Sequence, residues 1–248
     1  MCLQPCPNRA AKTENPERKR RKTWTDRNIK AYRSWVQKNG PGYVGKLTID
    51  CADFALFLLL TFAKENDLNI ALTAGFSYRD PFADRDMRNP ELSKAKSRVG
   101  AKDLFNVKQR NTVRIPFDEL LPGDLLVSER HVQVVLNPRN TVSVSMRVND
   151  FQKGETFLKR ERAPVLEILQ GNLRSDGPTK VQRRAYDLRV STSGERNNRY
   201  YEYNDADDTY TRQSSGDGQG WSAYDEQVDF QPRRWSFGRF NLESLVER

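Results

Sequence analysis

Cys51 and His131 are the two residues whose side chains suit nucleophilic chemistry. Cys51 follows Asp50 and stands just before the apolar run "ALFLLLTFA", in a chain that is otherwise polar and charged. His131 is the only histidine of the sequence. A cysteine nucleophile needs a base within hydrogen-bond reach and a third group that orients this base. The pair therefore predicts thiol catalysis if the fold brings the two side chains together. The alternative is a small buried cysteine that only fills space.

The segment from about Cys51 to Asn66 is predicted to be a helix that carries the thiol at its first turn. Asp50 suits the N-cap, and the helix is apolar almost all round, which is typical of a buried helix. The unpaired N–H groups and the dipole at a helix N-terminus favour negative charge. We therefore expect the pKa of the Cys51 thiol to be lowered and the group to be partly thiolate near neutral pH.

His131 is predicted to open a strand of an antiparallel sheet. The segment "LPGDLLV" contains a turn at Pro122-Gly123-Asp124 and then a strand, and "RHVQVVLN" follows as the second strand. Further strands are expected in "TVSVSMRV", "APVLEILQGNL" and "YDLRV". Gaps of hairpin size between them favour a meander. With a helix that Thr25 caps ahead of them, the pattern predicts an α+β fold in which a buried N-terminal helix packs on an antiparallel sheet.

Three short segments in this order resemble a known group of enzymes. "GYVGKLTIDCADFALFLLL", "LPGDLLV" and "HVQVVL" are similar to segments of the papain-like cysteine amidases and peptidases of the NlpC and CHAP kind. In those families an Asp-Cys pair opens a core helix, a Gly-Asp-Leu strand follows, and His-Val opens the next strand. The resemblance covers about residues 40–173. It implies a papain-like fold and hydrolysis of amide bonds.

The resemblance also implies roles for individual residues. Cys51 would be the nucleophile and His131 the general base. The third polar residue lies on a following strand in these families, which implies Asn172 here, with Gln170 as the nearer alternative. Tyr43 is similar to a tyrosine that helps to stabilise the oxyanion in some members. Weaker candidates for the third residue are Asn137, Asn140 and Ser143.

The sequence departs from the family pattern in two places. Many members have Ser-Gly after the Asp-Cys pair, where this chain has Ala52-Asp53. The insertion "SMRVNDFQKGETFLKRERAP" between strands is also longer than the pattern leads us to expect. Asp124 of the "GDLLV" segment is interpreted as a structural residue that ends a turn.

Four segments are predicted along the chain. Residues 1–23 are basic and rich in proline and are expected to form a disordered arm, and residues 24–190 are expected to form the catalytic domain. Residues 191–220 are rich in Ser, Gly, Asn and Asp, which predicts a polar loop or disordered excursion. Residues 221–248 bring aromatic side chains that are expected to pack on the core.

Composition limits the partners more than it identifies them. The 248 residues carry a net charge of +9, which suits an anionic polymer such as a cell wall or nucleic acid, with the basic N-terminal arm as one contact. The apolar run is too short to span a bilayer, and no signal peptide is predicted, which favours a cytoplasmic protein or non-classical export. Cys2 and Cys6 lack matching ligands nearby, so we expect neither a metal nor a cofactor.

These observations lead to one preferred function and two alternatives. The preferred function is a cysteine hydrolase that cleaves amide bonds, with peptidoglycan stem peptides as the expected substrate. The first alternative is a secreted effector or toxin that uses the same Cys-His site on a protein substrate. The second is a basic module without enzymatic activity that binds nucleic acid, because clusters such as "RKRRK" suit phosphate contacts.

Overall fold

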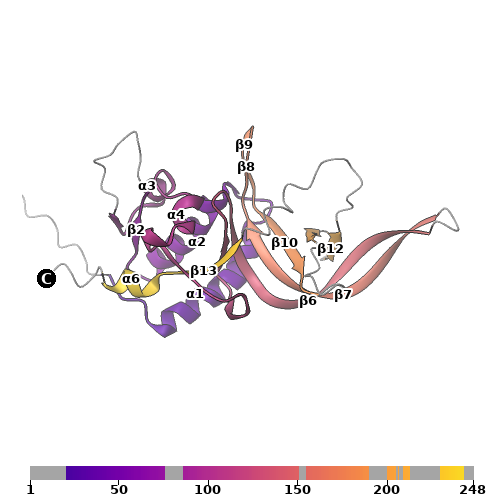
Figure 1. The fold of residues 1–248 in the computed structure, drawn as a ribbon, viewed down its shortest axis with the longest axis horizontal. Coiled ribbons are helices and arrows are strands. Elements are labelled where there is room, and N and C mark those ends of the chain that lie inside the picture. Colours follow the sequence, from indigo (N-terminus) through magenta and orange to yellow (C-terminus); the bar gives the residue numbers. More distant parts are fainter. Residues whose placement is uncertain are drawn as a thin grey trace, which may run out of the picture.

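The computed structural model describes most of the chain in separate ranges. These are residues 21–75, 86–150, 155–189, 200–204, 206, 209–212 and 230–242. Most of the predicted basic arm, with Cys2 and Cys6, and the first part of the aromatic C-terminal segment lie outside the described residues. Helices cluster in one part of the molecule, and two long strands curve away from them (Figure 1).

The helices and strands have the following bounds. The helices are α1 (Asp26–Asn39), η1 (Gly40–Tyr43), α2 (Cys51–Glu65), α3 (Leu92–Lys96), α4 (Ala101–Phe105), η2 (Val107–Gln109), η3 (Phe117–Glu119) and α6 (Phe237–Leu242). The first strands are β1 (Thr48–Ile49), β2 (Ala71–Thr73), β3 (Asp86–Arg88), β4 (Thr112–Arg114), β5 (Leu125–Val127), β6 (Val132–Asp150) and β7 (Glu155–Gln170). The remaining strands are β8 (Leu173–Arg174), β9 (Gly177–Lys180), β10 (Gln182–Asp187), β11 (Tyr200–Asn204), β12 (Thr209–Arg212) and β13 (Gln231–Trp235).

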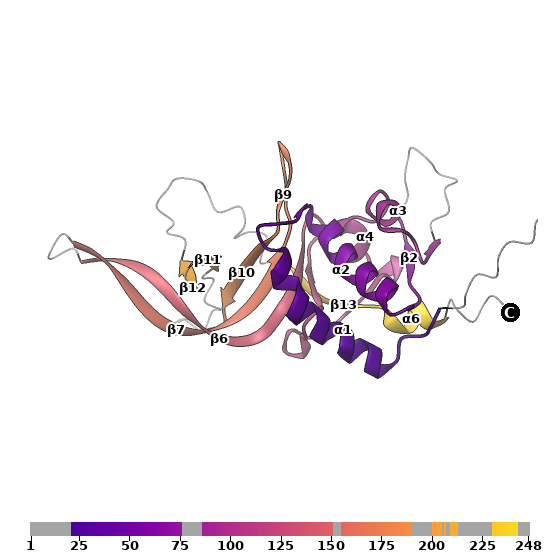
Figure 2. The same ribbon diagram turned by 180° about the vertical axis from the view of Figure 1, so that it is seen from behind.

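Helix α1 begins at Asp26, directly after Thr25, which the sequence predicts to be its N-cap. The side chain of Thr25 accepts a hydrogen bond from the N–H of Asn28, at 3.3 Å. Tyr32 and Val36, one turn apart, are buried against the core. The two longest helices, α1 and α2, lie side by side (Figure 2).

Helix α2 forms the centre of the hydrophobic core, as its sequence predicts. Ten of its fifteen residues are buried, including most of the apolar run. Trp24 packs beside it, 5.9 Å from the ring centroid of Phe62. The aromatic C-terminal segment joins this cluster through Phe237, whose ring centroid lies 4.6 Å from that of Trp24. Trp235, Phe237 and Phe240 of this segment are all buried.

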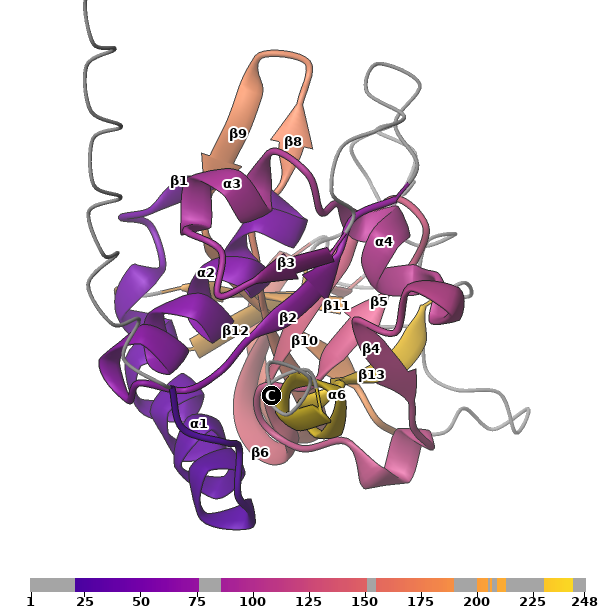
Figure 3. The same ribbon diagram turned by 90° about the vertical axis from the view of Figure 1, so that its left-hand side faces the viewer.

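The main sheet contains antiparallel pairs of consecutive strands, as the sequence predicts, and is extended by strands that the sequence did not predict. Among the described residues it has eight strands in the order β12-β11-β10-β7-β6-β5-β13-β4. Strands β5, β6, β7 and β10 pair with their neighbours in chain order, while β13 returns from the C-terminal part to pair with both β5 and β4. A second sheet of three strands has the order β1-β9-β8, and its β8–β9 hairpin projects away from the helices (Figure 3).

Strand β6 corrects the prediction of two strands in this part of the chain. The segment "RHVQVVLN" from Val132 onwards and the segment "TVSVSMRV" belong to a single strand that pairs along its length with β7. The residues between them, which were expected to form a turn, form register shifts between Val135 and Asn140. An extra residue bends a strand without ending it, and proline is tolerated at such a bulge. The long insertion forms the outer arms of this β6–β7 hairpin.

Residues 191–220 also differ from the expected loop, because they contribute two strands. Tyr201 of β11 and Tyr210 of β12 are almost completely buried, at 0% and 2% exposure. Strand β12 pairs in parallel with β6, through Tyr210 opposite Val144, so that strands β6, β7, β10, β11 and β12 close into a small barrel. The tyrosines fill the interior of this barrel, which is why a segment of polar composition still forms ordered strands.

A buried carboxylate organises the polar end of the barrel. Glu167 has 0% exposure and accepts hydrogen bonds from Arg183 and Asn140, both at 2.6 Å, and from the hydroxyl of Tyr210 at 2.5 Å. Burial alone would raise the pKa of Glu167, but the bond from Tyr210 and the charge of Arg183 outweigh it and lower the pKa. Glu167 is therefore ionised in the folded state, and its charge is paired.

Asp124 has the structural role that the sequence predicts. Its carboxylate accepts from the N–H of Leu121, at 2.9 Å, and closes the turn before β5. Both of its oxygens also accept from Arg234 of β13, at 2.9 and 2.8 Å. This bidentate ion pair ties β13 to the start of β5.

Candidate active site

Cys51 is the first residue of helix α2, and its thiol is almost completely enclosed. Asp50 caps the helix by accepting the N–H of Asp53, at 2.7 Å. The thiol residue itself is 8% exposed. The backbone N–H groups of Val132, Ala52 and Cys51 lie near the sulfur and act to lower its pKa. The first of these belongs to the residue directly after His131, so the thiol lies against the start of β6.

The resting state of this thiol differs from the sequence-based prediction. Burial raises the pKa of Cys51 to about 11, and the charge of Asp50 adds to the effect, while the backbone N–H groups oppose it. The expected lowering of the pKa is therefore wrong for the resting protein. The physical reason is that the loss of water around the sulfur and the negative N-cap together outweigh the helix N-terminus. The thiol is neutral near pH 7 and requires a base.

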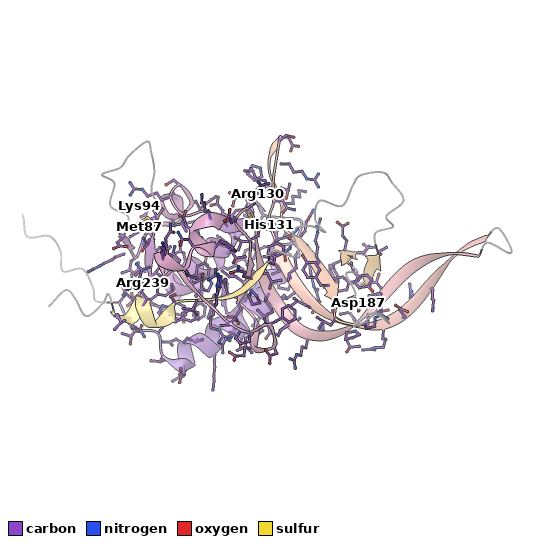
Figure 4. All side chains as sticks on the ribbon, in the orientation of Figure 1. Met87, Lys94, Arg130, His131, Asp187 and Arg239 are labelled. Carbon is purple, nitrogen blue, oxygen red and sulfur yellow. The ribbon has the colours of Figure 1, made fainter. Side chains whose placement is uncertain are left out.

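His131 is fixed by a tight turn before β6. The hydroxyl of Ser128 accepts from the N–H of His131 at 3.0 Å, and the N–H of Ser128 donates to the carbonyl of His131 at 2.9 Å. The ring of Phe230 packs beside the imidazole, with 5.9 Å between the centroids. Figure 4 labels Arg130 and His131 at the junction between the helices and the sheet. The imidazole is thus held on its backbone side and on one face.

Gln170 at the end of β7 is the polar partner of the imidazole. Its Oε1 atom lies 3.0 Å from Nε2 of His131. The same oxygen accepts from Nε2 of Gln133 at 2.8 Å, and Gln133 also donates to the hydroxyl of Tyr186 at 2.6 Å. A carbonyl oxygen can only accept, so a neutral His131 carries its proton on Nε2 and leaves Nδ1 with the lone pair of a base.

A close backbone contact brings the end of β7 to the start of α2. A Cβ atom at Gly171 would lie 2.2 Å from the carbonyl oxygen of Ile49 and 2.7 Å from that of Asp50. Only glycine allows the two backbones to approach so closely. Gln170 and Cys51 each adjoin this contact in the chain. Three separate segments therefore meet here: the N-terminus of α2, the turn before β6 and the end of β7.

Asn172 is the residue that the resemblance implied first as the partner of His131. Its backbone forms hydrogen bonds to Thr179 instead of continuing β7. Its N–H donates to Oγ1 of Thr179 at 3.2 Å, and its carbonyl accepts from the N–H of Thr179 at 2.7 Å. These bonds close the base of the β8–β9 hairpin. The residue in contact with the imidazole is Gln170, the alternative, because β7 ends there and its last side chain faces His131.

The other predicted site residues lie away from the thiol. Asn137 and Asn140 donate to Glu167, both at 2.6 Å, in the barrel. Ser143 pairs with Arg162 further along the β6–β7 hairpin. The side chains of Asn137 and Asn140 thus contact the barrel carboxylate, whereas the residue that contacts the imidazole is Gln170.

Tyr43 packs on the side of helix α2. Its ring lies 6.4 Å from that of Phe54 and 5.0 Å from that of Phe57, in edge-on contacts. Burial raises the pKa of Tyr43, and the charge of Glu65 at the far end of α2 raises it further. The contacts of Tyr43 are therefore with the flank of the helix, and its part in stabilising an oxyanion stays a prediction.

Gln133, Ser128 and Phe230 are site residues that the sequence reasoning missed. Gln133 stands two residues after His131 on a strand, and this spacing places both side chains on one face. The alternation of side chains along a strand could therefore have predicted that Gln133 lies beside His131. Ser128 could have been predicted from its position in the turn that precedes strand β6. Phe230 is remote in sequence and reaches the site only because β13 pairs with β5.

Comparison with protein-family models, curated proteins and solved structures finds no match for this chain. In the ranges that the structure describes, no helix has the length and apolar character needed to cross a membrane.

Proposed function

We propose that this protein is a cysteine hydrolase that cleaves amide bonds, with Cys51 as nucleophile, His131 as general base and Gln170 as the residue that orients the base. The contact that carries the proposal is the 3.0 Å separation between Nε2 of His131 and Oε1 of Gln170, next to Val132, whose backbone N–H acts to lower the pKa of the Cys51 thiol. Helix α2 with strands β5, β6 and β7 would then be a papain-like core of the NlpC and CHAP kind.

The mechanism follows from the resting protonation states. A neutral thiol attacks poorly, so Nδ1 of His131 would take the proton of Cys51 as the sulfur approaches the substrate carbonyl. Backbone N–H groups at the start of α2 are the available donors for the oxyanion. The imidazolium, held by Gln170, would then protonate the leaving amine. Water would release the acyl group with His131 acting as base again.

Peptidoglycan stem peptides are the substrate class that we propose. The family resemblance of the segments around Cys51 and His131 supports it, and the net charge of +9 suits an anionic cell wall. A protein substrate for a delivered effector would use the same chemistry. Mass spectrometry of the cleaved species separates the two: muropeptide fragments support the wall, and a cut protein supports the effector.

The test compares hydrolysis of purified sacculi and of a synthetic stem peptide by wild type, Cys51→Ala, His131→Ala and the control Cys2→Ala. Loss of the nucleophile or the base should lower the rate on the order of 10³-fold or more, and the control should retain the wild-type rate. Thermal unfolding of each variant checks that it is folded. Equal hydrolysis by wild type and both site variants would refute the proposal. A basic module that only binds nucleic acid would show salt-dependent binding and no response to Cys51→Ala.

A further inference from the structure

A row of hydrogen bonds runs away from His131 across three adjacent strands, β6, β7 and β10. Nε2 of His131 lies 3.0 Å from Oε1 of Gln170. Nε2 of Gln133 donates to that same oxygen at 2.8 Å and to the hydroxyl oxygen of Tyr186 at 2.6 Å. Gln133 and Gln170 are 3% and 2% exposed, so water competes little for these bonds.

A row built from carboxamides can have two directions. Each amide has an acceptor on one side and donors on the other, so turning both amides over reverses every bond. In the reversed row, Tyr186 would donate to Oε1 of Gln133, and Nε2 of Gln170 would donate to that oxygen. The other proton of Gln170 Nε2 would then go to Nε2 of His131, and a neutral imidazole would carry its own proton on Nδ1. The two directions therefore correspond to the two tautomers of His131.

Only one of these directions suits the proposed chemistry. In the observed direction, Nδ1 of His131 has the lone pair and is able to take the proton of Cys51. In the reversed direction, Nδ1 carries the proton and the lone pair points toward Gln170. The side chains that fix the direction of the row therefore decide whether the thiol has a base. This consequence for catalysis rests on the proposed function, whereas the tautomer itself does not.

The carboxamide of Gln133 favours the observed direction. Both protons of its Nε2 are used, one by Gln170 and one by Tyr186. Its Oε1 atom is buried and has no hydrogen-bond partner among the described residues. Turning the row over would put an NH₂ group in that place, and a buried N–H group without a partner is tolerated less readily than a carbonyl oxygen. Turning Gln133 alone would set two acceptor oxygens against each other at about the same 2.8 Å.

We propose that Gln133 is a positioning residue which, together with Tyr186, holds Oε1 of Gln170 toward the imidazole and thereby keeps the proton of neutral His131 on Nε2. Gln133 acts through Gln170 and takes no part in bond making or breaking. Its loss would lower the fraction of the protein in which the imidazole is ready to act as a base. The rate constant of the reaction should therefore fall, while the affinity for substrate should change little.

The tautomer can be observed directly, because His131 is the only histidine of the chain. Long-range ¹⁵N–¹H correlation spectra of the untagged full chain, labelled with ¹⁵N-histidine, show one pair of ring nitrogens. The spectra are recorded on the pH plateau where the ring is neutral. In wild type the Nε2–H form should exceed the Nδ1–H form about tenfold or more. In Gln133→Met, which keeps a long unbranched side chain but removes the donors, the two forms should come within about threefold of each other.

A second substitution separates positioning from a merely structural role. Gln170→Glu provides a carboxylate, which accepts hydrogen bonds whichever way it is turned and does not need Gln133 to orient it. In the Gln170→Glu background, Gln133→Met should therefore leave the Nε2–H form in excess. Tyr186→Phe removes the acceptor of one Gln133 proton and should give a smaller shift in the same direction as Gln133→Met. Gln37→Met changes an exposed glutamine of α1 and should match wild type.

Kinetics of the stem-peptide reaction tests the consequence for catalysis. Gln133→Met should lower kcat about tenfold with KM near that of wild type, and should cause no further loss in the Gln170→Glu background.

Thermal unfolding checks that each variant is folded, and Tyr186→Phe in both backgrounds decides the question if Gln133→Met does not fold. The proposal is wrong if wild type carries its imidazole proton on Nδ1, if the deciding variant keeps the wild-type ratio of tautomers, or if that ratio changes equally in both backgrounds. The expected spectra in a protein that hydrolyses no stem peptide would support the positioning role and refute only the proposed function.

Discussion

Oε1 of Gln170 lies 3.0 Å from Nε2 of His131, although Gln170 ends β7, His131 lies in the turn before β6, and neither neighbours Cys51 in the chain. The same oxygen accepts from Gln133, so it is held in place from a second side. This arrangement determines which imidazole nitrogen can act as a base. Four predictions follow from it and from the contacts around it.

Gln170→Ala should lower the hydrolysis rate on the order of 10²-fold, because the imidazole loses the acceptor that fixes its tautomer and orientation. Gln170→Asn should be intermediate, since it keeps the amide on a shorter side chain. Steady-state kinetics of the stem-peptide reaction measures both. The control is Asn172→Ala, whose hydrolysis rate should stay near that of wild type. A larger loss of rate for Asn172→Ala than for Gln170→Ala would show that Asn172, and not Gln170, orients the imidazole.

Alkylation of Cys51 should be slow at neutral pH and should increase with pH well into the alkaline range. The reason is that burial and the charge of Asp50 raise the pKa of its thiol to about 11. Peptide mapping after short pulses of iodoacetamide gives the rate for each cysteine separately. Cys2 and Cys6 serve as internal comparators in the same chain. A rate for Cys51 that reaches its plateau below pH 8 would contradict the neutral resting thiol.

Gly171→Ala should destabilise the protein by about 1–3 kcal/mol, since a Cβ cannot fit at 2.2 Å from the carbonyl oxygen of Ile49. The end of β7 would have to move away from the start of α2, so the hydrolysis rate should fall together with stability. Urea unfolding and the peptide assay measure the two effects. Gly42→Ala is the matched control, because a Cβ there meets nothing within 4 Å. Equal stability of the two variants would show that the contact is looser than described.

Glu167→Gln should lower stability at pH 7 by about 3–5 kcal/mol, because Arg183 loses its buried partner. The pKa of Glu167 is lowered in the folded protein, since the hydrogen bond from Tyr210 and the charge of Arg183 outweigh its burial. Its contribution is therefore present above the unfolded pKa, roughly 4.3, and is lost as the pH falls through the lower folded value.

The pH dependence distinguishes this carboxylate from others. Urea midpoints between pH 2 and pH 7 should fall less steeply on acidification for Glu167→Gln than for wild type. Glu119→Gln, an exposed control, should follow the wild-type curve. A Glu167→Gln curve parallel to that of wild type would mean that this group does not titrate as described.

Local sequence signals predicted the parts of the site that depend on short-range physics. The cap at Asp50, the buried helix after it, the turn at Asp124 and the strand that His131 opens follow from neighbouring residues, because capping, apolar periodicity and turn chemistry act within a few positions. The antiparallel pairing of β5, β6 and β7 in chain order is indicated by the same kind of signal.

Other features were decided by contacts between residues far apart in the chain. The resemblance implies Asn172 first and Gln170 as the alternative, and only the pairing of β7 with β6 and β10 places Gln170 on the imidazole. The two strands in the polar segment 191–220 depend on a barrel that buries Tyr201 and Tyr210. The single long strand β6 depends on bulges that β7 accommodates.

The sequence by itself determined that a thiol begins a buried helix and that one histidine begins a strand, because both are local facts. The tertiary structure decided the protonation state of that thiol, since its pKa depends on how completely water is excluded and on the charge nearby. It also decided which carboxamide meets the imidazole, because the register between strands comes from packing over the whole sheet.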